Sequence, residues 1–223
     1  MFTRNLFSGA ALVALTACGG GSGGGSDGGG VVSGDDIDLS SGTASYVELV
    51  LETERLTDLV ERDYVAVAPN NLVSDVEFNG IVLLADDFRT ATGGTSGYVG
   101  QVELTADVSS GRLSGTASNF FINTIASDGS PGNTAFSRDG ELTIDARFAS
   151  SPNFDVDVGG NLEVGGSGNN GTLRNVDGTI SGNFFGPSSS KVDAFAALGT
   201  AEDGNDLDLS GTSDTLDIAI AAD

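Results

Sequence analysis

The chain has 223 residues, with 9 basic against 32 acidic side chains and a net charge of −23 at neutral pH, which disfavours nucleic acid and anionic lipid surfaces as partners. It contains no histidine and one cysteine, so catalytic triads, cysteine dyads and His-based zinc or haem sites lack the residues they need. The composition therefore predicts no enzyme, no cofactor and no nucleic-acid partner.

The first 17 residues have the pattern of a secretory signal peptide. Arg4 precedes an apolar stretch centred on residues 10–15, which is too short to span a membrane. The segment leads into Leu15-Thr16-Ala17-Cys18, which resembles the bacterial lipobox of leucine, two small residues and cysteine. The resemblance implies cleavage before Cys18, a diacylglyceryl thioether on its sulfur and acylation of the new amino group. We therefore expect Cys18 to be the lipidation site, where several acyl chains hold the protein on a bilayer.

A flexible tether follows the expected anchor, over residues 18–34. Its run of glycines and serines, residues 19–30, has no side chains to bury and behaves as a coil with a reach of roughly 20 Å. Glycine after the cysteine, in place of aspartate, is typical of lipoproteins sorted to the outer membrane. We predict a lipid-anchored outer-membrane protein, and the sequence leaves open whether it faces the periplasm or the cell surface.

An acidic segment, residues 35–72, separates the tether from a predicted β domain at residues 73–223. Helical periodicity in this segment is weak: residues 50–60 fit a turn or two around Leu56 and Val60, and a strand is also compatible with the segment. With Cys18 lipidated no disulfide is possible, so the domain depends on its own apolar core.

The β domain alternates apolar and polar residues, with turn signals about every ten residues. Residues 141–148 alternate most regularly, and further strands are expected at 76–84, 98–106, 113–117, 154–158, 172–185, 192–198 and 216–220. A membrane-spanning barrel would carry aromatic girdles, but this chain has no tryptophan and three tyrosines. We predict an all-β fold: one soluble antiparallel barrel of about eight strands, filled by its own side chains, with at most one short helix.

The last long strand is predicted to stop at Gly186-Pro187. Proline cannot donate to a strand ladder and favours extended geometry before it, so this dipeptide is expected at a barrel rim. Phe184 is predicted to fill the barrel end, whereas Phe185 faces outward and covers a loop. Lys191, the only lysine, is expected to begin the return strand.

The β domain contains two motifs. The first comprises Tyr98, Gly100, Leu104, Asp107, Gly111, Leu113, Ser114 and Gly115, and the second Gly182, Phe184, Phe185, Gly186, Pro187 and Val192. Both resemble motifs of the β-barrel domains of transferrin-binding protein B and related bacterial surface lipoproteins. Ser189 and Lys191 depart from the alanine and glutamate of the second motif, and Asp193-Ala194 replaces its two final glycines. The resemblance covers about residues 73–200, and it implies a barrel in which these residues have structural roles.

The resemblance also implies a function. Such lipoproteins take iron or haem from carrier proteins and pass it to a TonB-dependent receptor, so we expect a binding module for a protein partner. The expected contacts lie in the connections at residues 90–97, 126–140 and 159–171, because loops on a rigid scaffold carry most binding sites. The alternative is a structural or protective envelope lipoprotein without a small-molecule ligand.

One acidic stretch has oxygen-bearing residues at spacings that suit Ca²⁺: Asp203, Asn205, Asp206 and Asp208. The EF-hand pattern fails here, because the fifth position counted from Asp203 is Leu207 and the sixth is not glycine. A similar stretch at residues 34–40 makes two acidic edge strands or turns the preferred interpretation. We therefore predict no metal site, with these four residues as a weak calcium candidate.

Overall fold

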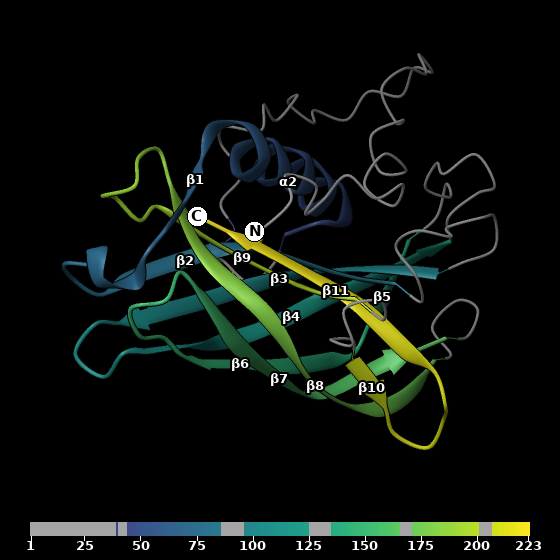
Figure 1. Cartoon of the computed structure of the whole chain (residues 1–223). Helices are drawn as coiled ribbons and strands as arrows, with labels where there is room; N and C mark the ends of the chain where they lie inside the picture. The colour runs from purple at the N-terminus through teal and green to yellow at the C-terminus, as the bar shows by residue number, and fades with distance from the viewer. Residues whose placement is uncertain (1–38, 40–43, 86–95, 125–134, 166–170, 201–206) are drawn as a thin grey trace, which may run out of the picture.

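The computed structural model describes residues 39, 44–85, 96–124, 135–165, 171–200 and 207–223. Their alternating apolar side chains form eight strand positions joined by antiparallel ladders (Figure 1). The main strands are β2 (Val76–Ala85), β3 (Ser96–Asp107), β4 (Arg112–Thr124), β6 (Gly140–Arg147), β7 (Asn153–Val164), β8 (Thr172–Gly186), β9 (Ala194–Gly199) and β11 (Thr215–Ala222). Each predicted strand range corresponds to one of these strands.

The sheet closes on itself. β2 pairs with β3 on one side and with β11 on the other, and pairing continues through β4, β6, β7, β8 and β9 back to β11. β9 and the short strand β10 (Leu207–Leu209) together fill one strand position of the barrel, because each of them pairs with both β8 and β11. Two further short strands flank the barrel, β1 (Val65–Val67) on β8 and β5 (Phe136–Arg138) on β4. The predicted all-β barrel of about eight strands is confirmed.

Inward-facing side chains of all these strands fill the barrel. At one end four phenylalanine rings surround that of Phe184, whose ring centroid lies 5.2–6.0 Å from those of Phe78, Phe148, Phe154 and Phe195. Phe184 has no exposed surface, as expected of a residue that fills a barrel end. Aromatic pairs at these distances add stabilisation beyond their buried area.

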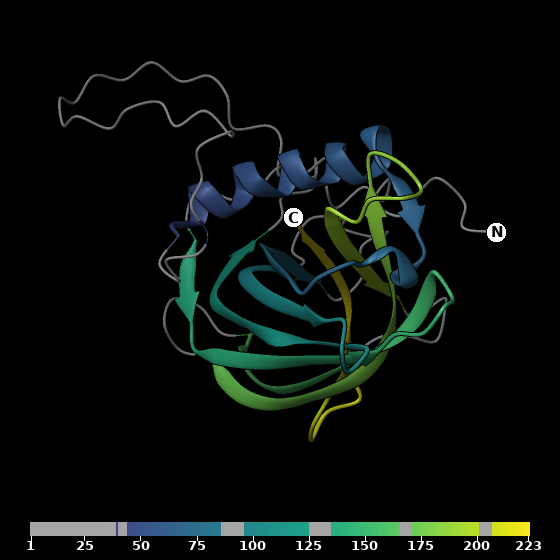
Figure 2. The ribbon, with the colours of Figure 1, turned by 90° about the vertical axis from the view of Figure 1, so that its left-hand side faces the viewer.

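A second apolar cluster lies outside the barrel, beneath helix α2 (Tyr46–Asp58). The helix contributes Leu49 and Leu56, and the wall contributes Ile81, Leu83, Val99, Phe185, Ala194, Ala196, Ala219 and Ala221. Figure 2 shows the helix crossing one side of the barrel. Four of the wall residues are alanines, whose small side chains let a helix pack closely. Phe185 therefore faces outward as predicted, but it is covered within this helix-bearing cluster.

Local signals explain where α2 begins and ends. Ser45 caps it: its N–H donates to the Glu48 carboxylate (2.6 Å) and its Oγ accepts from the Glu48 N–H (3.4 Å), a capping box. The helix continues into a π-helical turn, Leu59–Asp63, and ends at Tyr64, which is extended. The 13-residue helix is thus longer than the one or two turns that its weak periodicity predicted. No described helix is long and apolar enough to cross a membrane.

An ion-pair cluster joins α2 to the residue after β11. Arg55 donates through Nε to Glu52 (2.9 Å) and through Nη1 and Nη2 to the Asp223 carboxylate (2.8 and 2.6 Å). The Glu52 carboxylate is almost fully buried, so Arg55 compensates its charge. Hydrogen bonds to Glu52 and then to Asp223 raise the pKa of Arg55 further above its ordinary value.

The hairpin after β8 differs in detail from its prediction. β8 ends at Gly186 before Pro187 as expected, and Gly186 lies against the Lys191 carbonyl so closely that a Cβ would collide with it. Lys191 does not begin the return strand: it forms an isolated bridge with Ser188, and β9 begins at Ala194.

Asp107 organises the turn between β3 and β4. Its carboxylate accepts hydrogen bonds from the Ser109 N–H (2.8 Å), the Ser109 hydroxyl (2.7 Å) and the Ser110 N–H (3.1 Å). Gly111 completes the turn with a left-handed φ of 63°, which glycine adopts without strain. These hydrogen bonds, that of the Ser109 side chain above all, lower the pKa of Asp107 from 3.8 to about 2.

We predict that the Asp107 carboxyl titrates near pH 2 in the folded protein. Because the folded pKa lies below the unfolded one, the contribution of this turn to stability is complete above pH 3.8 and is lost as the pH falls through about 2. Carbon-detected NMR would measure the midpoint, which Ser109→Ala should move toward 3.8. A wild-type midpoint near the ordinary value would contradict the observed hydrogen bonds.

Candidate functional site: the loop end of the barrel

The two ends of the barrel differ in how their strands are joined. At the end that holds Phe184, the connections are the turns at residues 108–111 and 148–152 and the hairpin at 187–193. We call this the closed end, because the phenylalanine cluster fills it. At the other end, which we call the loop end, the strands are connected through residues 86–95, 125–135, 165–171 and 210–214. The short strands β5 and β10 lie at this end, on the right in Figure 1.

All three connections predicted to carry contacts leave from the loop end, although two are shorter than expected. Residues 136–138 form β5, and Gly140 begins β6. Residues 159–164 belong to β7 and pair with residues 172–177 of β8. The predicted loops therefore overlapped with strand ends, because glycines and asparagines in these strands have the composition of loops. Residues 90–95, 126–134 and 166–170 of the three predicted connections lie outside the described part of the chain.

Two buried polar side chains inside the loop end hold the backbone of Gly165. The Gly165 N–H donates to the Tyr98 hydroxyl (2.8 Å), and Arg138 donates through Nη2 to the Gly165 carbonyl (3.0 Å). Arg138 also donates to the Ser137 carbonyl (3.1 Å), and it is only 3% exposed. Gly165 has a left-handed φ of 66°, so it turns the chain where β7 ends.

Arg138 has no place in the sequence-based prediction, although the sequence carries a signal for it. Extending the alternation of Leu142 and Ile144 backwards by two steps places Arg138 on the inward face. The structure confirms this placement, because Arg138 pairs in register with Phe120, whose ring is buried in the barrel. A charged residue at an inward position of a strand is unusual and indicates a specific role.

Glu163 links two connections from the outer side of the same end. Its carboxylate accepts the Gly171 N–H through Oε1 (2.7 Å) and the Asp139 N–H through Oε2 (3.2 Å). The Glu163 N–H donates in turn to the Asp139 carbonyl (2.8 Å). One side chain thus contacts the junction of β5 and β6 and the residue that precedes β8.

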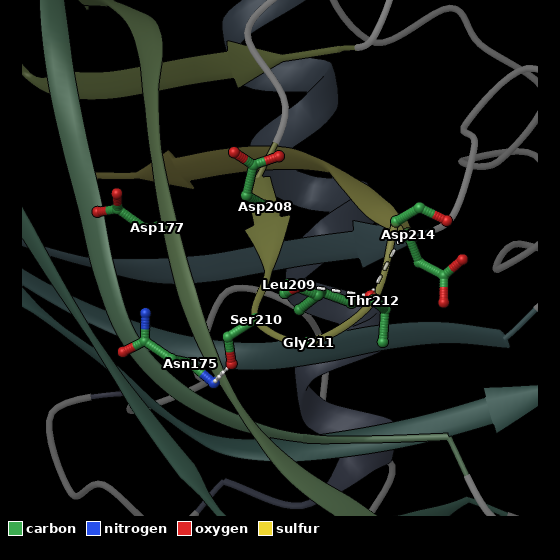
Figure 3. A pocket seen from close by; sticks show the side chains of 9 residues that line it. Asn175, Asp177, Asp208, Leu209, Ser210, Gly211, Thr212 and Asp214 are labelled. Atoms are coloured by element: carbon green, nitrogen blue, oxygen red, sulfur yellow. Dashed lines mark hydrogen bonds between the residues drawn. The ribbon is translucent and has the colours of Figure 1, made fainter.

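A shallow pocket of about 390 Å³ lies beside the turn between β10 and β11. Figure 3 shows its lining, which comprises Asn175, Asp177, Asp208, Leu209, Ser210, Gly211, Thr212, Ser213 and Asp214. The Ser210 N–H donates to the Asn175 carbonyl (2.9 Å), the Asn175 N–H donates to Ser210 Oγ (3.0 Å) and Arg174 donates to the Ser210 carbonyl (3.3 Å). These bonds fix the turn onto β8.

The pocket contains the one described member of the weak calcium candidate. Asp208 is exposed and lies opposite Asp177 in the β8–β10 ladder. Asp203, Asn205 and Asp206 lie outside the described residues. Among the residues that the structure describes, no group of three or more acidic side chains is arranged to hold a metal ion.

Most residues of the two motifs either pack closely against neighbouring strands of the barrel or form its turns. Gly100 lies under the Phe120 ring, and Gly182 lies under the Phe195 ring. Gly115 packs against the backbone of β3 at Leu104, and Pro187 is exposed just after β8. Gly111 and Gly186 serve the turns described above. Tyr98 differs from the others, since its hydroxyl reaches the loop end. Cys18 lies outside the described residues.

No protein-family model matches this chain, and neither the curated proteins nor the solved structures include one with significant similarity to it.

Proposed function

We propose that this protein is a lipid-anchored protein of the outer membrane whose barrel binds a protein partner through its loop end. The observation that supports the proposal most is the asymmetry of the barrel. Phenylalanines and short connections occupy one end, whereas the longest connections leave from the other. Because side chains fill the interior, a partner would bind to the outside of the barrel.

The chemistry of the chain favours a protein partner over a directly bound metal or haem. The sequence has no histidine, and its one cysteine is the expected lipidation site. A role in nutrient capture, as in the lipoproteins whose motifs this chain resembles, would therefore consist of holding a carrier protein or docking on a TonB-dependent receptor. The net charge of −23 favours a basic partner surface, and salt should slow association by screening it.

Photo-cross-linking in the native organism tests the proposal. A photoreactive phenylalanine would replace Ser137 or Thr172, which are exposed at the loop end, and Ser110 or Ser189, which are exposed at the closed end as matched controls. We expect both loop-end positions to cross-link to the same envelope protein and neither control to do so. Equal cross-linking from both ends would contradict the proposed site. No cross-link from any position would favour the structural or protective alternative.

Shortening one connection should remove the partner and leave the barrel intact. Val164 and Thr172 are directly paired, so deleting residues 166–170 leaves Gly165-Gly171 as a two-residue hairpin turn. Gly165 already has the positive φ that such a turn requires. We expect the melting temperature to change by less than about 3 °C, or roughly 1 kcal/mol for a domain of this size, while partner capture is lost. Undiminished capture would place the contact elsewhere.

Membrane attachment depends on the lipidation site. Cys18→Ser should abolish lipidation and move the protein from the membrane fraction to the soluble fraction, since no other acyl chain would hold it. Fractionation followed by a carbonate wash measures this, with Ser22→Ala in the tether as the control. A Cys18→Ser protein that stays with the washed membranes would refute lipid anchoring.

A further inference from the structure

Two chain segments at the loop end share hydrogen bonds with one carboxylate. Glu163 accepts N–H groups from Asp139, where β5 meets β6, and from Gly171, where the chain enters β8. Asp139 follows the connection at residues 125–135, and Gly171 ends the connection at residues 165–171. The Glu163 side chain therefore joins the ends of two connections that are separate in the sequence.

Tyr98 and Arg138 hold the same region from inside the barrel. Tyr98 accepts the Gly165 N–H at 2.8 Å, and Arg138 donates to the Gly165 carbonyl at 3.0 Å. Both side chains are buried, at 4% and 3% exposure. Both the N–H and the carbonyl of Gly165 are therefore held by buried side chains. Two residues earlier, the Glu163 carboxylate is hydrogen-bonded to Asp139 and Gly171.

We infer that Glu163, Tyr98 and Arg138 are positioning residues that join residues 137–140, 163–165 and 171–172 into one rigid rim at the loop end. The part of this inference that concerns a partner rests on the proposed function. A rim with fixed geometry presents its two segments to a partner as one surface and avoids the entropic cost of ordering them on binding. Asp139 is the exposed charge of the rim, so the matching face of a protein partner is basic.

The choice of glutamate at residue 163 supports this role. The negative charge of Glu163 is not needed for its own sake, since the chain already carries 32 acidic residues. A carboxylate, however, offers two acceptor oxygens and can receive two N–H groups at once, which an aliphatic or hydroxyl side chain cannot do in this geometry. Glu141, on the outer face of β6, is exposed and provides a matched comparison.

Amide hydrogen exchange tests whether the rim is one unit. The experiment uses the mature chain with Cys18→Ser, alone and with Glu163→Ala, Glu163→Gln or the control Glu141→Ala. Glu163→Ala should accelerate exchange at both Asp139 and Gly171 by roughly tenfold, the usual effect of losing a hydrogen bond to a charged group. Glu163→Gln keeps one acceptor oxygen and should accelerate only one of them. Exchange that changes at neither amide, at one amide in Glu163→Ala, or equally in the control, would overturn the inference.

A second readout separates a positioning role from a merely structural one. With Glu163→Ala, cross-linking from Ser137 and from Thr172 should fall together, while the melting temperature falls by no more than about 6 °C and the barrel stays folded. Undiminished cross-linking despite faster exchange would overturn the positioning role. If the parent protein gives no cross-link at all, the proposed function fails, and the exchange experiment still decides by itself whether the rim is coupled.

Discussion

Phe184→Ala should lower the free energy of unfolding by about 3–5 kcal/mol, the usual cost of deleting a buried phenylalanine. Its ring is fully buried and contacts four other phenylalanine rings. Phe78, Phe154 and Phe195 belong to strands whose ladders fix them, and the Phe148 N–H donates to the Gly111 carbonyl (2.9 Å). These neighbours therefore cannot collapse into the space that the ring leaves. Urea denaturation followed by circular dichroism would measure the loss.

The neighbouring residue provides the matched comparison. Phe185→Ala should cost clearly less, roughly 1–2 kcal/mol, since the loss depends on how well a site can close. Phe185 lies on the outer wall beneath α2, and a helix packed on a wall can move toward it. Leu173→Ala, at a position that is 59% exposed, should change stability by less than about 0.5 kcal/mol. Equal losses for the two phenylalanines would mean that their faces are assigned wrongly.

Arg55→Met should destabilise the protein by about 3 kcal/mol, because it leaves the Glu52 carboxylate buried without its partner. Glu52 is 3% exposed, and Arg55 is the residue that joins it to Asp223. The barrel core does not include this cluster, so we expect the loss to appear mainly as release of α2 from the wall. Loss of helical circular dichroism before the β signal would show such a release.

A double variant separates the burial of charge from the loss of packing. Combining Arg55→Met with Glu52→Gln removes the uncompensated charge and should recover most of the lost stability. Arg112→Met, which removes an exposed ion pair with Asp145 on the opposite wall, serves as the control and should cost less than about 1 kcal/mol. A double variant no more stable than Arg55→Met would show that the aliphatic stem of Arg55 matters more than its charge.

Much of the barrel could be predicted from alternation alone, and the exceptions have identifiable causes. β6 and β7 alternate strictly, because their outer faces meet water and their inner faces meet the core. The alternation is interrupted in β4. Asn119 adopts a left-handed φ of 53°, and a bulge in the β3–β4 ladder moves the inward positions from Ala117 to Phe120. A bulge of this kind leaves almost no trace in a single sequence.

The placement of α2 was not predicted, although the wall that receives it has a recognisable composition. Ala-Phe-Ala-Ala-Leu-Gly in β9 and Ile-Ala-Ile-Ala-Ala in β11 are apolar on both faces, which is typical of strands covered on both sides. The periodicity of the helix itself was too weak to identify it, because Glu52 and Thr53 lie on its buried side. Their cost is offset by Arg55 and by a bond from Thr53 Oγ1 to the Leu49 carbonyl (2.8 Å).

For the loop end, the sequence by itself indicated three connections, although strand residues take up part of two of them. Their common origin at one end follows from the closed antiparallel order of the strands, in which every second connection returns to the same side. The sequence also determined that Phe184 faces the core and that Gly186-Pro187 ends its strand. Only the tertiary structure decided that Glu163 accepts N–H groups from Asp139 and Gly171, and that Tyr98 and Arg138 both hold Gly165. These contacts join residues 8 to 67 positions apart, and their geometry depends on the barrel's closure and register, which period-two patterns do not encode.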